Sequence, residues 1–128
     1  MTRPLHKKST TATIAARFDA DVERFSNLET GQAATIDAPL AMELVTEAAL
    51  AATSPIRRVL DVGCGAGNLT LKLLRAGSGS YDCDLNDLSL PMLDRARERV
   101  SAETTGAVRT FHGDFRDQPL EAGSYDLV

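Results

Sequence analysis

The stretch that decides the fold of this chain reads Val59-Leu60-Asp61-Val62-Gly63-Cys64-Gly65-Ala66-Gly67-Asn68. Its first four residues are typical of a buried β-strand, since three of them are aliphatic. Three glycines at alternating positions follow, and residues 69–74 then have the apolar pattern of a helix. A strand, a glycine turn and a helix N-terminus together form a cradle for a nucleotide-like ligand, because glycines let the backbone approach the ligand closely.

The spacing of the glycines narrows the choice of ligand. Dinucleotide-binding turns favour G-x-G-x-x-G, whereas here the third glycine comes one residue early, as Gly63-x-Gly65-x-Gly67. With Asp61 before it, the segment resembles motif I of the class I S-adenosylmethionine-dependent methyltransferases. The resemblance implies that the loop, Cys64 included, passes under the methionine part of S-adenosyl-L-methionine. Asp61 would be a buried carboxylate in need of partners, and the resemblance makes it an organiser of the loop or an acceptor for the cofactor ammonium.

Strands and helices alternate from this stretch to the end of the chain. We predict strands at 58–62, 81–86 and 107–112, a helix at 66–75, a second helix capped by Ser89 and ending near Val100, and the start of a fourth strand at 125–128. Such alternation forms right-handed βαβ units around a parallel sheet. The expected fold is α/β, a Rossmann-like three-layer αβα arrangement with a parallel sheet. Because the family resemblance implies seven strands, we expect an N-terminal fragment truncated after the start of strand four.

The residues before the first strand are predicted to be helical. Apolar residues recur at helical spacing over Ile14–Phe25, and Asp37-Ala38-Pro39 is a start signal for a helix over 39–52, after a loop at 28–36. The second helix would present one apolar face, made of Leu40, Leu44, Val45, Ala48 and Ala49. We therefore divide the chain into a disordered tail (1–13), a helical lead-in or cover (14–57) and the cofactor-binding core (58–128). The charges of the first helix fit an ordinary solvated face equally well.

An acidic residue, Asp87, stands at the predicted end of the second strand, about 20 residues after the glycines. Nucleotide-binding α/β folds place an acid there to accept hydrogen bonds from ribose hydroxyls. The run Asp87-Leu88-Ser89-Leu90-Pro91-Met92-Leu93-Asp94-Arg95-Ala96 resembles the D-L-S-x-x-M-L-x-x-A segment of the same family. The resemblance implies that Leu88 packs on one face of the adenine, whereas Met92 is expected in the core. Asp87 capping the next helix is the alternative, and Asp84 would take the ribose role if the strand ended earlier.

The predicted third strand runs into His112-Gly113-Asp114-Phe115. This resembles the G-D-x segment of the family, which implies that Asp114 accepts from the adenine amino group and that Phe115 lines the adenine slot. Such a charge-assisted hydrogen bond is worth about 1.5–3 kcal/mol when shielded from water. A surface turn would also account for Asp114. A satisfied or exposed His112 is favoured over a catalytic base.

Composition argues against several other classes of protein. A net charge of −4 argues against a broad electrostatic grip on nucleic acid. No apolar run approaches the roughly 18 residues that span a bilayer, and residues 1–13 lack the apolar core of a secretory signal. Cys64 and Cys83 form no Cys-x-x-Cys motif, so they indicate buried thiols in a reducing cytoplasm and no metal site. We expect a cytoplasmic protein with neither a nucleic-acid nor a membrane partner, and the sequence carries no signal for an oligomeric state.

The resemblance implies a methyltransferase in which a substrate N, O, C or S atom attacks the sulfonium methyl of the cofactor. Because a sulfonium is a good leaving group, the protein mainly orients the reactants and excludes water, and no catalytic residue is named. The expected acceptor is a small molecule. Two alternatives stay open: a non-catalytic module that binds cofactor or protein, and a nicotinamide-dependent oxidoreductase, against which the early third glycine counts. The fragment alone is expected to be inactive.

Overall fold

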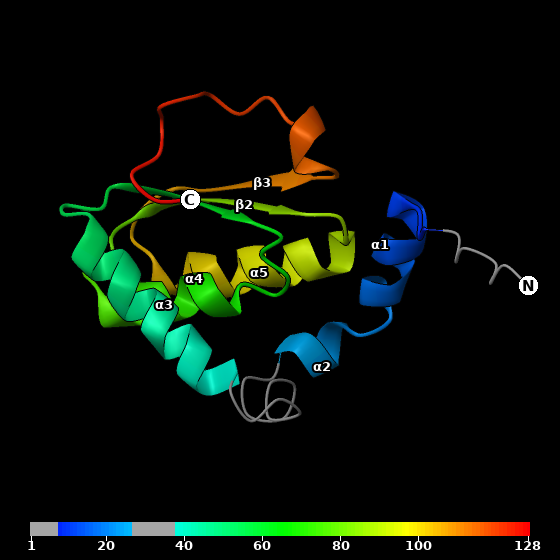
Figure 1. Cartoon of the computed structure of the whole chain (residues 1–128), viewed down its shortest axis with the longest axis horizontal. Helices are drawn as coiled ribbons and strands as arrows, with labels where there is room; N and C mark the ends of the chain where they lie inside the picture. The colour runs from blue at the N-terminus through cyan, green and yellow to red at the C-terminus, as the bar shows by residue number, and fades with distance from the viewer. Residues whose placement is uncertain (1–7, 27–37) are drawn as a thin grey trace, which may run out of the picture.

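Three parallel strands in the order β1-β2-β3 form the centre of the molecule in the computed structural model, which describes residues 8–26 and 38–128. The strands are β1 (Arg58–Val62), β2 (Asp82–Asp87) and β3 (Val108–His112). Helices α3 (Ala38–Ala52), α4 (Asn68–Ala76) and α5 (Leu90–Glu103) lie on one side of the sheet, and the segment after the 3-10 turn η1 (Phe115–Asp117) crosses the other side (Figure 1). The predicted α/β parallel fold is confirmed.

The core lies between the sheet and its helices. Cys83 and Leu85 of the middle strand are fully buried, and they pack with apolar residues that recur at helical spacing on α4 and α5: Leu71, Leu74, Leu93, Ala96 and Val100. β2 reads as polar in the sequence because its other face carries Asp82, Asp84 and Asn86. The alternation of strand side chains thus separates an apolar helix side from a polar opposite side.

The end of the described chain returns to the free edge of β1. Val59 and Leu127 form a parallel bridge, in which the Leu60 amide donates to the Leu127 carbonyl at 3.0 Å and the Asp126 amide donates to the Arg58 carbonyl at 2.9 Å. β1 therefore has β2 on one side and the start of the predicted fourth strand on the other. This is the order expected for the Rossmann-like sheet.

The predicted single helix over Ile14–Phe25 is wrong in its extent. The structure has two helices, α1 (Thr11–Asp19) and α2 (Val22–Ser26), with α1 starting earlier because the Thr10 side chain caps it. Between the helices the Asp21 amide donates to the Phe18 carbonyl at 3.1 Å. Each helix has its own polar contact with the region of α5, which a local apolar stripe cannot predict.

Smaller differences between the predicted and the observed bounds of helices and strands have local causes. Helix α4 starts at Asn68 and not at Ala66, because its cap residue Gly67 has a left-handed φ of 84°. β2 is shifted by one residue, to 82–87, whereas Ser89 caps α5 as predicted, its side chain accepting from the Met92 amide. The predicted capping residue Asp37 and loop 28–36, with residues 1–7 of the predicted tail, lie outside the described residues.

Helix α3 does not bury the apolar face expected for it. Leu40, Leu44 and Val45 are 58%, 56% and 52% exposed, whereas Thr46 is buried. Of the predicted face, only Ala49 packs against the core, together with Leu50, which was not predicted there. Within the described residues, no helix combines the length and the apolar character that crossing a membrane requires.

Candidate functional site

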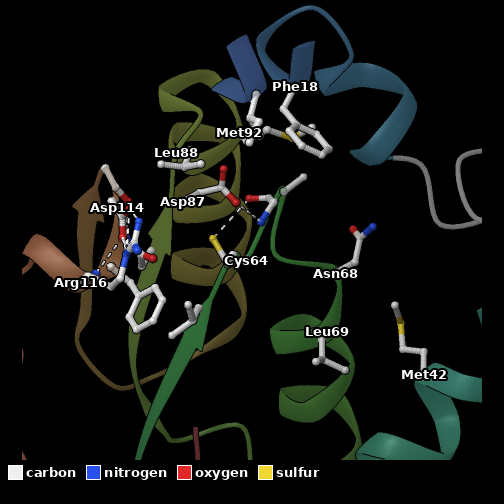
Figure 2. Close-up of a pocket in the computed structure, with 18 residues that line it drawn as sticks. Phe18, Met42, Cys64, Asn68, Leu69, Asp87, Leu88, Met92, Asp114 and Arg116 are labelled. Carbon is white, nitrogen blue, oxygen red and sulfur yellow. Dashed lines mark hydrogen bonds and ion pairs between the residues drawn. The ribbon is translucent and has the colours of Figure 1, made fainter. Parts of the chain in front are cut away.

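A cavity of about 710 Å³ opens at the carboxyl ends of the three strands. This is the edge at which open α/β sheets bind ligands. Its wall comes from the glycine loop, the start of α4, the ends of β2 and β3, and helices α1, α3 and α5 (Figure 2). The lining residues are Ile14, Phe18, Met42, Val62, Gly63, Cys64, Gly65, Ala66, Asn68, Leu69, Asn86, Asp87, Leu88, Met92, Gly113, Asp114, Phe115 and Arg116.

The three glycines of the loop have two different structural roles. All have positive φ, at 68°, 55° and 84° for Gly63, Gly65 and Gly67, a conformation that side chains with a Cβ rarely adopt. A Cβ on Gly63 or Gly65 would meet no atom within 4 Å. A Cβ on Gly67 would lie 3.3 Å from Ala96 and Val100 of α5. The first two glycines therefore keep their surroundings open, whereas the third allows α4 and α5 to pack closely.

Asp87 joins the glycine loop to the end of β2. Its Oδ2 accepts from the Gly65 amide at 2.8 Å, and its Oδ1 accepts from the Ser89 amide at 2.9 Å. The neighbouring Asn86 carbonyl accepts from the Cys64 amide at 2.9 Å. Each carboxylate oxygen has a second lone pair, so Asp87 can accept further hydrogen bonds while holding the loop. The residue thus both faces the cavity and stabilises the turn before α5.

At the end of β3, Asp114 is held by Arg116. The guanidinium donates from Nε to Oδ1 at 2.9 Å and from Nη2 to Oδ2 at 2.5 Å, and the Arg116 amide also donates to Oδ1, at 3.0 Å. These hydrogen bonds, led by that of the side chain, lower the pKa of Asp114 to about 2. Asp114 is therefore an anion at every physiological pH. Leu88 and Phe115 line the cavity as well.

Asp61 lies behind the glycine loop and outside the lining of this cavity. Its Oδ2 accepts from the Thr70 hydroxyl at 2.6 Å, which links β1 to the first turn of α4. Burial raises the pKa of Asp61 above its ordinary value. The Thr70 hydrogen bond opposes this shift, and the charge of Asp87 adds to it. Gly67 also lies behind the wall, whereas the other residues predicted to bind the cofactor, Gly63, Cys64, Gly65, Asp87, Leu88, Asp114 and Phe115, all line it.

Among the described residues, Cys64, Cys83 and His112 have no contact that would activate them as a nucleophile or base. Burial raises the pKa of the Cys64 thiol far above neutrality and that of Cys83 to about 12, and both cysteines are free. His112 is exposed, and its Nε2 donates to the Leu88 carbonyl at 3.0 Å. Among residues 8–26 and 38–128, no group of His, Cys, Asp and Glu could hold a metal ion.

Several lining residues were not predicted from the sequence. Phe18 and Ile14 come from α1, Met42 from α3, and Arg116 from η1. The only sequence signal for Ile14, Phe18 and Met42 was the general expectation that the N-terminal helices cover the core, and Arg116 had none. Met92, expected in the core, is buried and also forms part of the cavity wall.

Comparison with known proteins agrees with this geometry. A family model described as a methyltransferase domain matches residues 59–128, which is more than half of the chain. The chain belongs to the class I S-adenosylmethionine-dependent methyltransferase family. S-adenosylmethionine is accordingly the cofactor of this domain, and the nicotinamide-dependent alternative is set aside.

Individual relatives match over different lengths. Magnesium-protoporphyrin O-methyltransferase of Rhodobacter capsulatus is 38% identical over 71 residues, which cover 56% of this chain and 30% of that protein. The biotin biosynthesis bifunctional protein BioCD of Bordetella avium (strain 197N) is 32% identical over 116 residues, covering 90% of this chain and 23% of that protein. The crystal structure of the [4+2]-cyclase SpnF is similar in fold, with a TM-score of 0.65 and 17% identity, covering 92% of this chain and 47% of that one. The chain spans less than half the length of each.

The residues of the cavity fit S-adenosylmethionine. The volume of the cavity, about 710 Å³, lies within the ~300–1,000 Å³ typical of sites for small ligands. Gly63 and Gly65 leave room for a ligand to lie against the backbone. The carboxylate of Asp87 accepts one hydrogen bond on each oxygen, so it suits a ligand with hydroxyl donors. Asp114 already accepts two hydrogen bonds on each oxygen from Arg116, so an exocyclic amine would share or displace one of them.

Proposed function

We propose that this chain forms the cofactor-binding part of an enzyme that transfers a methyl group from S-adenosylmethionine to a small-molecule acceptor. The observation that carries the proposal is the open backbone at Gly63 and Gly65, facing a cavity that Asp87 also lines. A small acceptor is supported by the net charge of −4, which gives no general attraction for nucleic acid. It is also supported by the name of the magnesium-protoporphyrin O-methyltransferase relative.

The residues predicted to bind the cofactor have distinct proposed roles. Asp87 accepts hydrogen bonds from the ribose hydroxyls, and Asp114 accepts one from the adenine amino group. Leu88 and Phe115 contact the apolar faces of the adenine. The Gly63–Gly65 backbone, with Cys64, lies under the methionine part. Asp61 organises the loop from behind, since its carboxylate accepts from Thr70 on α4.

The bound cofactor supplies an activated methyl group on a sulfonium leaving group. The residues of the chain orient that group and exclude water from it. Orientation of two reactants can contribute roughly 7–11 kcal/mol to lowering a barrier. Ile14 and Phe18 of α1 and Met42 of α3 form apolar parts of the wall that exclude water. The proposed cover of the core 58–128 is the lead-in 14–57, of which α1 and α3 supply these wall residues. We assign no catalytic residue, because the Cys64 thiol stays protonated and His112 is engaged with Leu88.

Gly65→Val tests the role of the glycine loop. Valine is strained at a φ of 55° and would place its side chain where no protein atom lies within 4 Å. We expect calorimetry to find S-adenosylhomocysteine binding at least ten-fold weaker. Gly123→Val is the matched control, because Gly123 also has positive φ, at 72°, with nothing within 4 Å, but lies away from the cavity. Equal affinities for the two variants would exclude the loop as the cofactor site.

Asp87→Ala and Asp114→Ala test the two carboxylates. Each variant removes a charge-assisted acceptor, so S-adenosylhomocysteine should bind about 1–3 kcal/mol more weakly, or roughly five- to a hundred-fold. Asp117→Ala is the control, because Asp117 shares the turn with Asp114 but does not line the cavity. An Asp117 variant as damaged as the Asp114 variant would mean that the turn, and not a direct contact, determines affinity.

A non-catalytic cofactor-binding module is the rival function. It predicts the same affinities but no methyl transfer by the whole protein. Labelled S-adenosylmethionine with a small-molecule extract distinguishes the two, because only an enzyme moves the label into an extractable product.

A further inference from the structure

The acceptor positions of the Asp114 carboxylate are filled by a single residue, Arg116. Oδ1 accepts from the Arg116 amide at 3.0 Å and from Nε at 2.9 Å, while Oδ2 accepts from Nη2 at 2.5 Å and from the same Nε at 3.2 Å. A carboxylate has about four lone-pair sites, so these contacts use them all. Figure 2 shows the two side chains joined by dashed lines. A ligand donor therefore reaches Asp114 by displacing a contact to Arg116.

Asp87, the other carboxylate that lines the cavity, is less fully occupied by the described residues. It accepts one hydrogen bond on each oxygen, from the Gly65 amide at 2.8 Å and from the Ser89 amide at 2.9 Å. With these two donors, each oxygen keeps one lone pair. Ribose hydroxyls can thus add to the contacts of Asp87, whereas an adenine amine must exchange with a contact of Asp114. Competition for the acceptor therefore arises at Asp114 and not at Asp87.

The Arg116 side chain is the more exposed partner of this pair. It is 74% exposed, whereas the Asp114 side chain is 19% exposed. An exposed guanidinium leaves a carboxylate at little cost, because water replaces the contacts that it loses. The turn is also held by backbone groups, since Asp114 caps η1 by accepting from the Arg116 amide, and the Asp114 carbonyl accepts from the Asp117 amide at 3.1 Å. The guanidinium can therefore yield a contact while Asp114 stays in place.

We propose that Arg116 competes with the adenine amino group for Asp114 and thereby sets how strongly the cofactor site discriminates in favour of that amine. The inference rests on the proposed function, which places the adenine amine at Asp114. The contact from Nε to Oδ2, at 3.2 Å the longest of the four, is the one that the amine displaces. Nη2 and the Arg116 amide keep the carboxylate oriented. Because one contact is exchanged for another, the loss of affinity in Asp114→Ala lies toward the five-fold end of its expected range.

The test measures how much the amine contributes to binding with and without the guanidinium. Calorimetry compares S-adenosylhomocysteine with its 6-deamino analogue, in which a hydrogen atom replaces the adenine amino group. Arg116→Met removes the guanidinium but keeps the backbone amide that donates to Asp114. We expect the affinity for S-adenosylhomocysteine divided by that for the analogue to rise about two- to five-fold, the range typical of exposed ion pairs. Packing of the methionine on the ring affects both ligands alike and leaves this ratio unchanged.

Arg97→Met is the matched control for the loss of charge. It removes the same charge from the exposed face of α5, where Arg97 lies 3.8 Å from Asp94, is 59% exposed and does not line the cavity. Its affinity ratio should equal that of the original chain. In Arg116→Met combined with Asp114→Ala the raised ratio should disappear, because the acceptor is gone.

The outcomes separate the inference from the proposed function. An unchanged ratio in Arg116→Met, or a rise that Arg97→Met shares, would overturn the competition while leaving cofactor binding in place. A lower ratio would also overturn it, because Arg116 would then position Asp114 for the amine. A rise that survives the loss of Asp114 would place the amine elsewhere and overturn the inference as well. Failure of S-adenosylhomocysteine to bind the original chain would overturn the proposed function, and the inference with it.

Discussion

Asp61 is a carboxylate that the fold holds in an unfavourable place. Burial raises its pKa above the ordinary 3.8, so the folded state disfavours its ionised form. A raised carboxyl pKa gives a contribution to stability that is fully present below the unfolded pKa and is lost as the pH rises through the folded pKa. At neutral pH the charge of Asp61 therefore lowers the stability of the fold. A residue kept at such a cost is a candidate for a functional role.

Asp61→Asn should therefore raise the melting temperature at pH 7, since the amide oxygen can still accept from Thr70. The gain should shrink as the pH falls through the raised pKa of the folded state toward the ordinary 3.8, because the carboxyl of the original chain becomes protonated over this range. Thermal melts across this range measure it, with Asp94→Asn on the exposed face of α5 as the control. If the loop needs the charge, the same variant binds S-adenosylhomocysteine more weakly, which is a trade between stability and function. A lower melting temperature at pH 7 would contradict the assignment of Asp61 as a destabilising charge.

At the scale of elements, helix α1 is held to the rest of the fold by a polar contact, and none of its side chains is buried. Ile14 and Phe18 nevertheless form part of the cavity wall. Its last residue, Asp19, accepts from the Ser89 hydroxyl at 2.5 Å. Ser89 also donates its amide to Asp87 and caps α5. One residue thus connects the covering helix to the carboxylate proposed for the ribose.

Asp19→Ala should release α1 without unfolding the core. We expect faster trypsin cleavage after Arg17, together with an unchanged melting temperature, because the helix buries no residue of its own. Bound S-adenosylhomocysteine should also dissociate faster. Asp21→Ala is the matched control, since Ser89 has a single hydroxyl proton and gives it to Asp19. Equal cleavage rates in the two variants would show that the Asp19 contact does not hold the helix.

Elements with local signals could be predicted from the sequence, and those set by distant contacts could not. β1 was predicted to the residue, and the start of α5 followed from Ser89 as a cap. The break between α1 and α2 accompanies separate contacts to Ser89 and Arg95, far along the chain, so no local pattern marks it. The prediction that the apolar stripe of α3 is its buried face was wrong, because α3 buries Thr46 and leaves Leu44 exposed.

The residues of the candidate site also fall into those that a local motif predicts and those that only the fold brings to the cavity. The glycine loop and the carboxylates at the ends of β2 and β3 each lie in a short motif at a strand end, where the topology of a parallel sheet brings them together. Phe18 and Met42 reach the cavity from helices that precede the sheet, and their own neighbours in sequence carry no sign of it. Arg116 needs the turn geometry of η1 to meet Asp114.

At the scale of the whole molecule, Asp84 joins all the strands on the side of the sheet away from the helices. It is 2% exposed, and it accepts from Arg58 of β1 at 3.1 Å, from Arg109 of β3 at 2.6 Å and from the Tyr125 hydroxyl at 2.6 Å. Burial and this hydrogen bond raise the pKa of Tyr125 to about 12. The Tyr125 contact holds the segment that returns to β1, where Leu127 accepts from the Leu60 amide. Asp84 therefore stabilises the sheet, and the proposed role of binding the ribose hydroxyls stays with Asp87.

Asp84→Ala should destabilise the fold by about 2–4 kcal/mol. Breaking a fully buried ion pair costs roughly 3–5 kcal/mol, and the cost is smaller here because Arg58 and Arg109 are 27% and 53% exposed and can be hydrated. Urea unfolding followed by circular dichroism measures it, since the chain has no tryptophan. Glu103→Ala, which breaks the exposed pair with Arg75, should leave the midpoint unchanged.

Asp84→Ala should loosen the segment that returns to β1, which Tyr125 helps to hold, before it unfolds the sheet. Hydrogen exchange of the Leu60 amide, which depends on Leu127, should accelerate more than exchange of the Cys83 amide, which donates to Ala107 inside the sheet. This order follows because the segment is held through Tyr125, whereas the strands keep their own hydrogen bonds. If both amides accelerate equally, Asp84 stabilises the sheet as one cooperative unit, and the segment after η1 is held by its backbone bonds to β1 and by the Asp126 carboxylate, which accepts from the Arg57 and Arg58 amides.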